Sequence, residues 1–145
     1  DEIFIGSGSA LSHCGLLLGL RAMGDATPVS GICVRRDASA QAVRVAARLN
    51  DLAELLDIEN PAGADGIRVD ASLLAPGYGR MSGAVRSAVT RTARTEGLFL
   101  DPVYTGKVMA GLIARASKLR GKRVLFWHTG GQPALFAYAG AFGDG

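Results

Sequence analysis

Short apolar runs that resemble β-strands alternate with longer runs that resemble α-helices along the 145 residues of this chain. The strand-like runs cover residues 3–5, 29–34, 67–69 and 124–127, and the helix-like runs cover 10–23, 39–56, 82–95 and 105–119. Neighbouring parallel strands need a long crossover connection, which is usually a helix. The alternation therefore predicts an α/β fold with a mostly parallel sheet and helices on both faces.

Local signals set the expected ends of these helices. Ser82 and Thr105 are candidate N-caps, and Gly97 and Gly121 are suited to follow a last helical turn. The helix at 39–56 carries an apolar stripe that we expect to face the core, made of Val43, Ala46, Ala47, Leu49, Leu52, Leu55 and Leu56.

The composition excludes several classes of function. Hydrophobic residues make up 48% of the chain, charged residues make up 20%, and the net charge is +3. The arginines are spread over the expected helices and form no basic patch, so we expect no nucleic-acid partner. The longest apolar stretch, at 16–20, is far too short to cross a bilayer, so we expect no membrane partner.

The two cysteines indicate a reducing environment. Cys14 and Cys33 form neither a CxxC motif nor a zinc-binding spacing, so we expect two buried free thiols, no metal site and a cytoplasmic location. The length suits one compact core. Because the chain starts at Asp1 and is strand-like by residue 3, we expect residues 1–145 to be a single α/β segment cut from a longer protein.

Glycine-rich segments converge on one edge of the predicted sheet. GSGSALS, YTGK and HTGG belong to the edge formed by the carboxyl ends of the strands, where parallel sheets bind ligands. Backbone N–H groups and hydroxyls in residues 7–12 open a helix, which favours an anion site over a merely tight turn. His13 lies in the first turn of that helix, where the dipole disfavours a charged imidazole, so we expect a neutral histidine and not a base.

A dinucleotide site is the main competing interpretation. Gly6 and Gly8 match the first two glycines of the fingerprint, but Leu11 occupies the third position. Arg35 and Arg36 follow the next strand and could bind the 2′-phosphate of NADP. A serine hydrolase is disfavoured because the chain contains no GxSxG motif.

Four further side chains are candidates at this edge. Tyr78 and Tyr104 each stand beside glycine in a loop, and a phenol can stack on a ring or exchange a proton. For Lys107 we expect a solvated or ion-paired side chain. His128 is expected to pack beside the ligand, and the apolar run 134–138 is expected to close the site from behind as core.

Four segments in this order resemble one enzyme family: SGSALSHCGLLLGL, APGYG, EGLFLDPVYTGKVMAGLI and LFWHTGGQPALFAY. They are similar to the C-terminal portion of the D-cysteine desulfhydrase and 1-aminocyclopropane-1-carboxylate deaminase family. These are fold-type II enzymes that use pyridoxal 5′-phosphate (PLP). The resemblance covers nearly the whole chain and implies that residues 1–145 are the cofactor-binding part of such an enzyme.

The resemblance implies roles for individual residues. The segment Ser9, Ala10, Leu11 and Ser12 resembles the cup that holds the cofactor phosphate, although family members often have Gly-Thr in place of Leu11-Ser12. Tyr78 and Tyr104 resemble the two active-site tyrosines. Thr129 resembles the residue that faces the pyridine nitrogen, with room for the ring left by Gly130 and Gly131. Thr105 is assigned to cofactor contact, and with Thr129 it favours the desulfhydrase-like branch.

The family implies β-elimination from D-cysteine, giving pyruvate, ammonia and sulfide. L-cysteate sulfo-lyase and 1-aminocyclopropane-1-carboxylate deaminase activities are the alternatives, and each has a small amino acid as its substrate. Family members are commonly homodimers. Their cofactor-binding lysine belongs to the N-terminal half, which no segment here resembles, and Lys107, Lys118 and Lys122 do not stand in its motif. We therefore expect this segment to be inactive alone.

Overall fold

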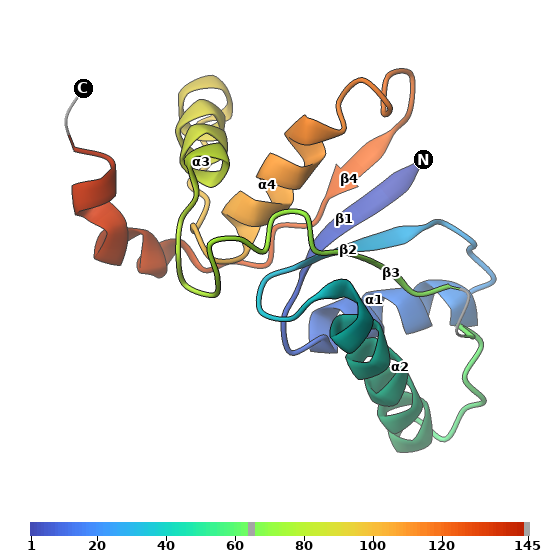
Figure 1. Ribbon diagram of the computed structural model, residues 1–145. Coiled ribbons are helices and arrows are strands. Elements are labelled where there is room, and N and C mark those ends of the chain that lie inside the picture. Colours follow the sequence, from blue (N-terminus) through green and yellow to red (C-terminus); the bar gives the residue numbers. More distant parts are fainter. Residues whose placement is uncertain (64–65, 144–145) are drawn as a thin grey trace.

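A computed structural model describes residues 1–63 and 66–143 of the chain (Figure 1). The strands are β1 (Glu2–Ser7), β2 (Val29–Cys33), β3 (Arg68–Asp70) and β4 (Val124–Phe126). The α-helices are α1 (Leu11–Ala22), α2 (Ala38–Leu55), α3 (Gly83–Glu96) and α4 (Thr105–Ala114), and a 3-10 helix, η1, covers Gln132–Ala141. The strands pair in parallel in the order β3-β2-β1-β4, which confirms the predicted α/β class.

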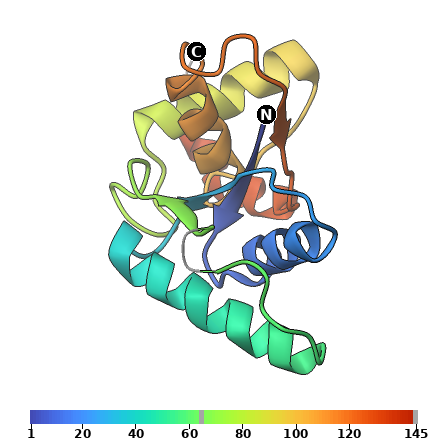
Figure 2. The same ribbon diagram turned by 90° about the vertical axis from the view of Figure 1, so that its right-hand side faces the viewer.

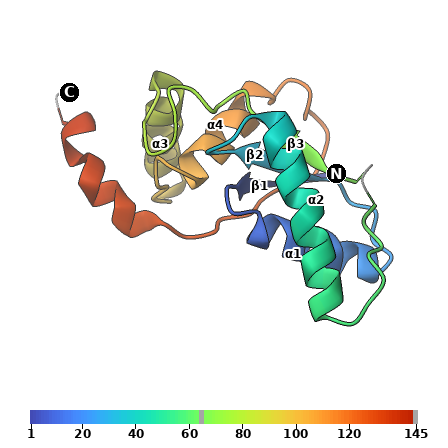
Figure 3. The same cartoon turned by 60° about the horizontal axis from the view of Figure 1, so that its bottom comes forward.

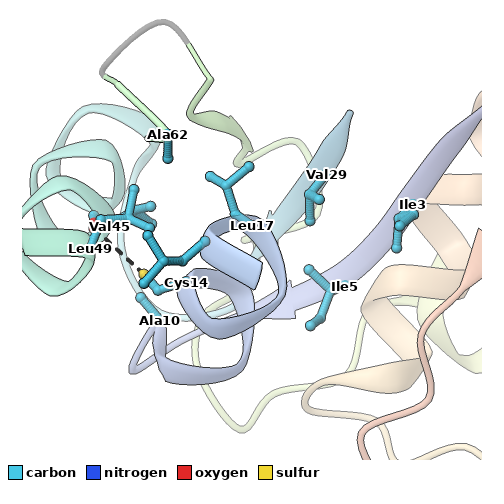
Figure 4. Close-up of a cluster of buried hydrophobic side chains, with 10 residues drawn as sticks. Ile3, Ile5, Ala10, Cys14, Leu17, Val29, Val45, Leu49 and Ala62 are labelled. Carbon is cyan, nitrogen blue, oxygen red and sulfur yellow. Dashed lines mark hydrogen bonds between the residues drawn. The ribbon is translucent and has the colours of Figure 1, made fainter. Parts of the chain in front are cut away.

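Helices cover both faces of this sheet (Figures 1 and 2). On one face, Ile3, Ile5 and Val29 pack against Leu17 of α1, and the same cluster reaches Leu49 of α2 (Figure 4). On the other face, the alternate strand residues Phe4 and Ile32 pack against Val108 of α4. Because side chains alternate along β1, its apolar residues contribute to the hydrophobic core on both faces of the sheet.

The part of the chain farthest from the sheet is built around α3 and η1. Helix α3 packs on α4 through a cluster that contains Val85, Val89 and Leu100. The 3-10 helix η1 extends beside α3 and away from the sheet (Figure 3). Within the described residues, no helix is both long enough and apolar enough to cross a membrane.

Two helix ends follow the sequence signals. The hydroxyl of Ser82 accepts a hydrogen bond from the backbone N–H of Val85 at 3.3 Å, as expected of an N-cap. Gly97 adopts a left-handed conformation with φ of 67°, which a residue without Cβ takes at little cost.

Helix α4 differs from its prediction at both ends. Tyr104, and not Thr105, is the N-cap residue, and its side chain makes no capping bond. The helix ends at Ala114 and does not reach 119, and the guanidinium of Arg115 donates to the carbonyl oxygen of Gly111. The N–H of Arg115 bonds instead to the carbonyl of Leu112, in the tighter 3-10 pattern.

One predicted core surface was partly wrong and another was wrong, although Leu49 and Leu52 of the α2 stripe do pack in the core. The buried face of α2 is Gln41, Val45, Leu49 and Ala53, whereas Val43 and Leu55 are exposed. The run at 134–138 forms part of η1, none of whose residues is buried, and Phe136 is 83% exposed. Its residues therefore do not close the site from behind as core.

Candidate functional site

A cavity of about 300 Å³ lies at the carboxyl edge of the sheet. It is lined by Gly6, Gly8, Ser9, Ala10, Leu11, Ser12, Tyr104, Thr129, Gly130 and Gly131. These residues come from the end of β1 and the turn into α1, from the N-cap of α4 and from the segment after β4. The predicted meeting of the three glycine-rich segments is therefore observed.

The β1–α1 turn presents backbone N–H groups at the start of a helix. Ala10 has a left-handed backbone with φ of 78°, and the first bond of α1 runs from the N–H of Cys14 to the carbonyl of Ala10 at 2.8 Å. The N–H groups that precede Cys14 in the first turn have no acceptor within the helix. Such groups bind anions, with help from the helix dipole.

Side chains from the β2–α2 loop and from α2 hold the carbonyl groups of this turn. The carbonyl oxygen of Gly8 accepts hydrogen bonds from Nη1 of Arg36 at 3.0 Å and from Nε2 of Gln41 at 3.3 Å. The carbonyl oxygen of Ser9 accepts from Nε of Arg44 at 3.3 Å. In a trans peptide the carbonyl and the following N–H point in opposite directions. The N–H groups of Ser9 and Ala10 therefore point away from these side chains.

A buried polar cluster lies beneath the turn. The hydroxyl of Ser7 accepts from Nε2 of Gln41 at 2.8 Å and lies 3.1 Å from Nδ1 of His13. Burial lowers the pKa of His13 to about 4, so the imidazole is neutral near pH 7, as expected for a packing histidine. A Cβ at Gly31 would lie 2.5 Å from the His13 ring, so the cluster requires glycine at that position.

The two tyrosines meet beside the cavity, which Tyr104 lines and Tyr78 does not. The hydroxyls of Tyr78 and Tyr104 are 2.7 Å apart, and their rings meet edge to face at 6.1 Å. The hydrogen bond to Tyr78 and partial burial raise the pKa of Tyr104 to about 12, so its phenol stays protonated near pH 7. The guanidinium of Arg35 lies 5.8 Å from the centre of the Tyr78 ring.

Asp101 fixes the start of α4 and was missed in the sequence. Its buried carboxylate accepts hydrogen bonds from the N–H groups of Val103, Tyr104 and Thr105 at 2.7–2.9 Å. The hydroxyl of Thr105 donates to the same carboxylate at 2.7 Å, and Thr105 does not line the cavity. This differs from the cofactor contact expected of Thr105. The sequence did offer a signal for this role, because Asp101 stands three residues before Tyr104, at the start of the helix, and aspartate is a common capping residue.

The HTGG segment forms the opposite wall of the cavity. The N–H of Gly130 donates to Nδ1 of His128 at 3.1 Å, so the proton on the ring belongs on Nε2, which lies 3.3 Å from the carbonyl oxygen of Phe99. Gly130 and Gly131 have φ of 90° and 91°, which strongly favours glycine. A Cβ at Gly131 would also lie 2.9 Å from Oδ1 of Asp101. His128 thus shapes the turn, while Thr129 lines the cavity.

Lys107 differs from its expected state. It is fully buried on α4, and its Nζ donates to the carbonyl oxygens of Leu74 and Gly77, each at 3.0 Å. Among the described residues it forms no salt bridge. It is therefore neither solvated nor ion-paired, and it does not line the cavity.

Both cysteines are buried free thiols, as predicted. Burial raises the pKa of Cys14 and of Cys33 to about 11, which keeps both in the unreactive thiol form near pH 7.

Comparison with known proteins agrees with this geometry. The chain is 42% identical, over 95% of its length, to the proteins named D-cysteine desulfhydrase of Klebsiella pneumoniae strain 342 and of Klebsiella pneumoniae subsp. pneumoniae strain ATCC 700721 / MGH 78578. It covers 42% of each of them, less than half their length. A solved structure described as a homologue of ACC deaminase superposes with a TM-score of 0.86 at 31% identity, over 98% of this chain and 43% of the other.

The family assignment rests on most of the chain. Residues 1–130 match the family described as "Pyridoxal-phosphate dependent enzyme", and this range includes every residue that lines the cavity except Gly131. The two arginines that were candidates to bind the 2′-phosphate of NADP make other contacts. Arg36 donates to the carbonyl oxygen of Gly8, and Arg35 lies over the ring of Tyr78. The chain belongs to the family of pyridoxal-phosphate dependent enzymes.

Proposed function

We propose that this protein is a PLP-dependent carbon–sulfur lyase that converts D-cysteine and water into pyruvate, ammonia and sulfide. The main observation in support is that one cavity is lined by the N-terminal turn of α1 with its free backbone N–H groups, by Tyr104 and by Thr129. The identity to D-cysteine desulfhydrases over 95% of the chain supports this choice of reaction. When bound, PLP supplies an electron-withdrawing ring that weakens the bonds at the α-carbon of an amino acid.

The cavity fits the phosphate of this cofactor. We assign the phosphate to Ser9, Ala10, Leu11 and Ser12, where N–H groups and two hydroxyls are available. The cradle depends on glycine, because a Cβ at Gly8 would lie 3.0 Å from Val34 and 3.2 Å from Tyr104. The neighbouring carbonyls are held by Arg36, Gln41 and Arg44, so their repulsion of an anion is reduced.

We assign the other end of the cofactor to the HTGG wall. The hydroxyl of Thr129 is proposed to meet the pyridine nitrogen, and Gly130 is proposed to leave room for the ring. A hydroxyl favours protonation of that nitrogen less than a carboxylate would. The resulting weaker electron withdrawal suits loss of a β-substituent better than the opening of a cyclopropane ring.

Tyr78 and Tyr104 are proposed to act on the substrate as catalytic residues. Since the pKa of Tyr104 is about 12, this phenol keeps its proton near pH 7 and can donate a hydrogen bond to a substrate atom that gains negative charge. The partner hydroxyl at 2.7 Å can pass or accept that proton. We propose that the pair orients the substrate and assists departure of the sulfur as hydrogen sulfide.

The lysine that binds the cofactor covalently is proposed to come from outside residues 1–145. The described residues that line the cavity include no lysine, and Nζ of Lys107 is held by two carbonyl groups. We accordingly propose that residues 1–145 form one cofactor-binding unit of the enzyme. The buried thiols support a reducing compartment, which we propose is the cytoplasm. A homodimer is proposed by resemblance to the family.

L-cysteate is the second candidate substrate. Arg35 places a cation over the ring of Tyr78, whose hydroxyl meets the cavity-lining Tyr104, and a cation there suits an anionic sulfonate. An Arg35→Gln variant separates the two, since activity on L-cysteate would fall while activity on D-cysteine would remain.

The test is an assay of the full-length protein with D-cysteine, L-cysteate and 1-aminocyclopropane-1-carboxylate side by side. We expect a visible absorbance band from bound PLP, and we expect sulfide and pyruvate to form fastest from D-cysteine. A colourless protein that retains NADPH would contradict the proposal.

A further inference from the structure

Lys107 is a buried cation that the proposed chemistry does not use. It is 0% exposed, and its Nζ donates to the carbonyl oxygens of Leu74 and Gly77, each at 3.0 Å. Burial lowers the pKa of this ammonium group. Because removing an ammonium from water is costly, a buried lysine needs strong polar contacts, and these two carbonyls supply them.

Both carbonyls belong to the loop that carries Tyr78. Gly77 directly precedes Tyr78, and Lys107 lies on α4 one turn after Tyr104. One side chain therefore joins the backbone next to the first tyrosine to the helix that begins at the second.

The backbone on the other side of Tyr78 is held as well. The hydroxyl of Tyr138, on η1, donates to the carbonyl oxygen of Gly79 at 2.5 Å. Tyr78 itself is 50% exposed, so burial alone does not fix its ring. Its position depends on how the loop backbone is anchored.

Resting on the roles proposed above for the two tyrosines, we propose that Lys107 is a positioning residue. Its ammonium group holds the loop at 74–79 so that the hydroxyl of Tyr78 meets the hydroxyl of Tyr104. A lysine that merely filled the core would affect stability and leave the hydroxyl pair intact. The state of the pair therefore distinguishes the two roles.

The test uses the full-length protein and matched substitutions. Lys107→Met keeps most of the length of the side chain and removes its donors, and Lys107→Arg keeps donors. Lys118→Met is the control, because Lys118 is exposed in the turn after α4. Lys107→Gln keeps one amide donor group, and it replaces Lys107→Met as the test variant if Lys107→Met does not fold.

The main readout is the ionisation of Tyr104, followed by NMR of protein that contains tyrosine labelled with carbon-13 at Cζ. Tyr104→Phe assigns the resonance, and Tyr78→Phe gives the value without the hydroxyl pair. Asp101 and Arg35 also act on this phenol, and both stay in place in every variant. This readout needs neither substrate nor cofactor.

We expect the pKa of Tyr104 to stay near 12 in the wild type, Lys107→Arg and Lys118→Met. In Lys107→Met it should fall toward the value of Tyr78→Phe, with a smaller fall in Lys107→Gln. The kcat for D-cysteine should drop roughly tenfold in Lys107→Met while PLP affinity is unchanged. A folded Lys107→Met or Lys107→Gln protein whose Tyr104 titrates as in the wild type would overturn the inference. Failure of the wild type to act on D-cysteine would instead overturn the proposed function.

Discussion

The hydroxyl groups of Tyr78 and Tyr104 lie 2.7 Å apart, although the two residues are 26 positions apart in sequence. Each is placed by a buried charged side chain from the segment 101–107. Asp101 accepts a bond from the N–H of Tyr104, and Lys107 donates to the carbonyl next to Tyr78. The geometry of the pair thus depends on side chains that bind the backbone at or beside each tyrosine.

Removing one hydroxyl should change the other. In Tyr78→Phe the pKa of Tyr104 should fall from about 12 toward its ordinary value of 10, because the hydrogen bond that favours the protonated phenol is gone. If the pair serves the reaction, kcat for D-cysteine should fall about 10²-fold. Steady-state kinetics and a tyrosine titration measure the two effects. The control is Phe136→Ala, which alters an aromatic side chain that is 83% exposed.

Gln41 should control affinity for the phosphate and not for the ring. From α2, its Nε2 donates to the hydroxyl of Ser7 and to the carbonyl oxygen of Gly8. Gln41→Met should therefore loosen the turn and weaken PLP binding by about tenfold. Pyridoxal, which lacks the phosphate, should bind as well as before. Fluorescence titration with both ligands decides this, with Asn50→Ala on the exposed side of α2 as the control. Equal losses for both ligands would argue against a role at the phosphate.

His13 should make stability depend on pH. Burial lowers its pKa from 6.5 to about 4, so below pH 6.5 the unfolded chain takes up a proton that the folded chain does not. The stabilisation is complete above pH 6.5 and is lost as the pH falls to about 4. The difference corresponds to about 3 kcal/mol in the free energy of unfolding. Urea titrations across this range should show the loss, and His13→Asn should remove that part of the slope.

Gly31 should not tolerate a methyl group. A Cβ there would lie 2.5 Å from the His13 ring, so Gly31→Ala should destabilise the protein by about 1–3 kcal/mol. Gly15→Ala is the matched control, because Gly15 lies on α1 with nothing within 4 Å of the added Cβ. It should be neutral or stabilise by up to about 1 kcal/mol. Chemical denaturation of the two variants tests the contrast.

The parallel sheet and the edge that forms the cavity could be predicted because they depend on local patterns. Apolar runs set the strands, and glycine with small hydroxyl residues marked the turn at 7–12. Gly97 ended α3 where its sequence signal predicted, since a left-handed cap is a property of a single residue. These features require no knowledge of distant partners.

The features that could not be predicted depend on contacts between distant segments. Lys107 was expected to be solvated or ion-paired, and its partners Leu74 and Gly77 lie about thirty residues away along the chain. Threonine is a residue type that often caps helices, so Thr105 was expected to be an N-cap. The carboxylate of Asp101 instead accepts the hydrogen bonds at this helix start, including one from the hydroxyl of Thr105. The run at 134–138 is apolar enough for a core, yet it forms an exposed 3-10 helix, since hydropathy alone does not say what an element packs against.

The cavity between the β1–α1 turn and the HTGG segment is the proposed site of PLP for reaction with D-cysteine. The most direct measurement is sulfide release from D-cysteine by the full-length protein, before and after removal of its PLP. We predict that activity is lost with the cofactor and returns when PLP is added. In Ser9→Glu, which puts a negative charge in the cavity, the activity should not return. Sulfide release that is unchanged by removal of PLP, or full PLP binding by Ser9→Glu, would contradict it.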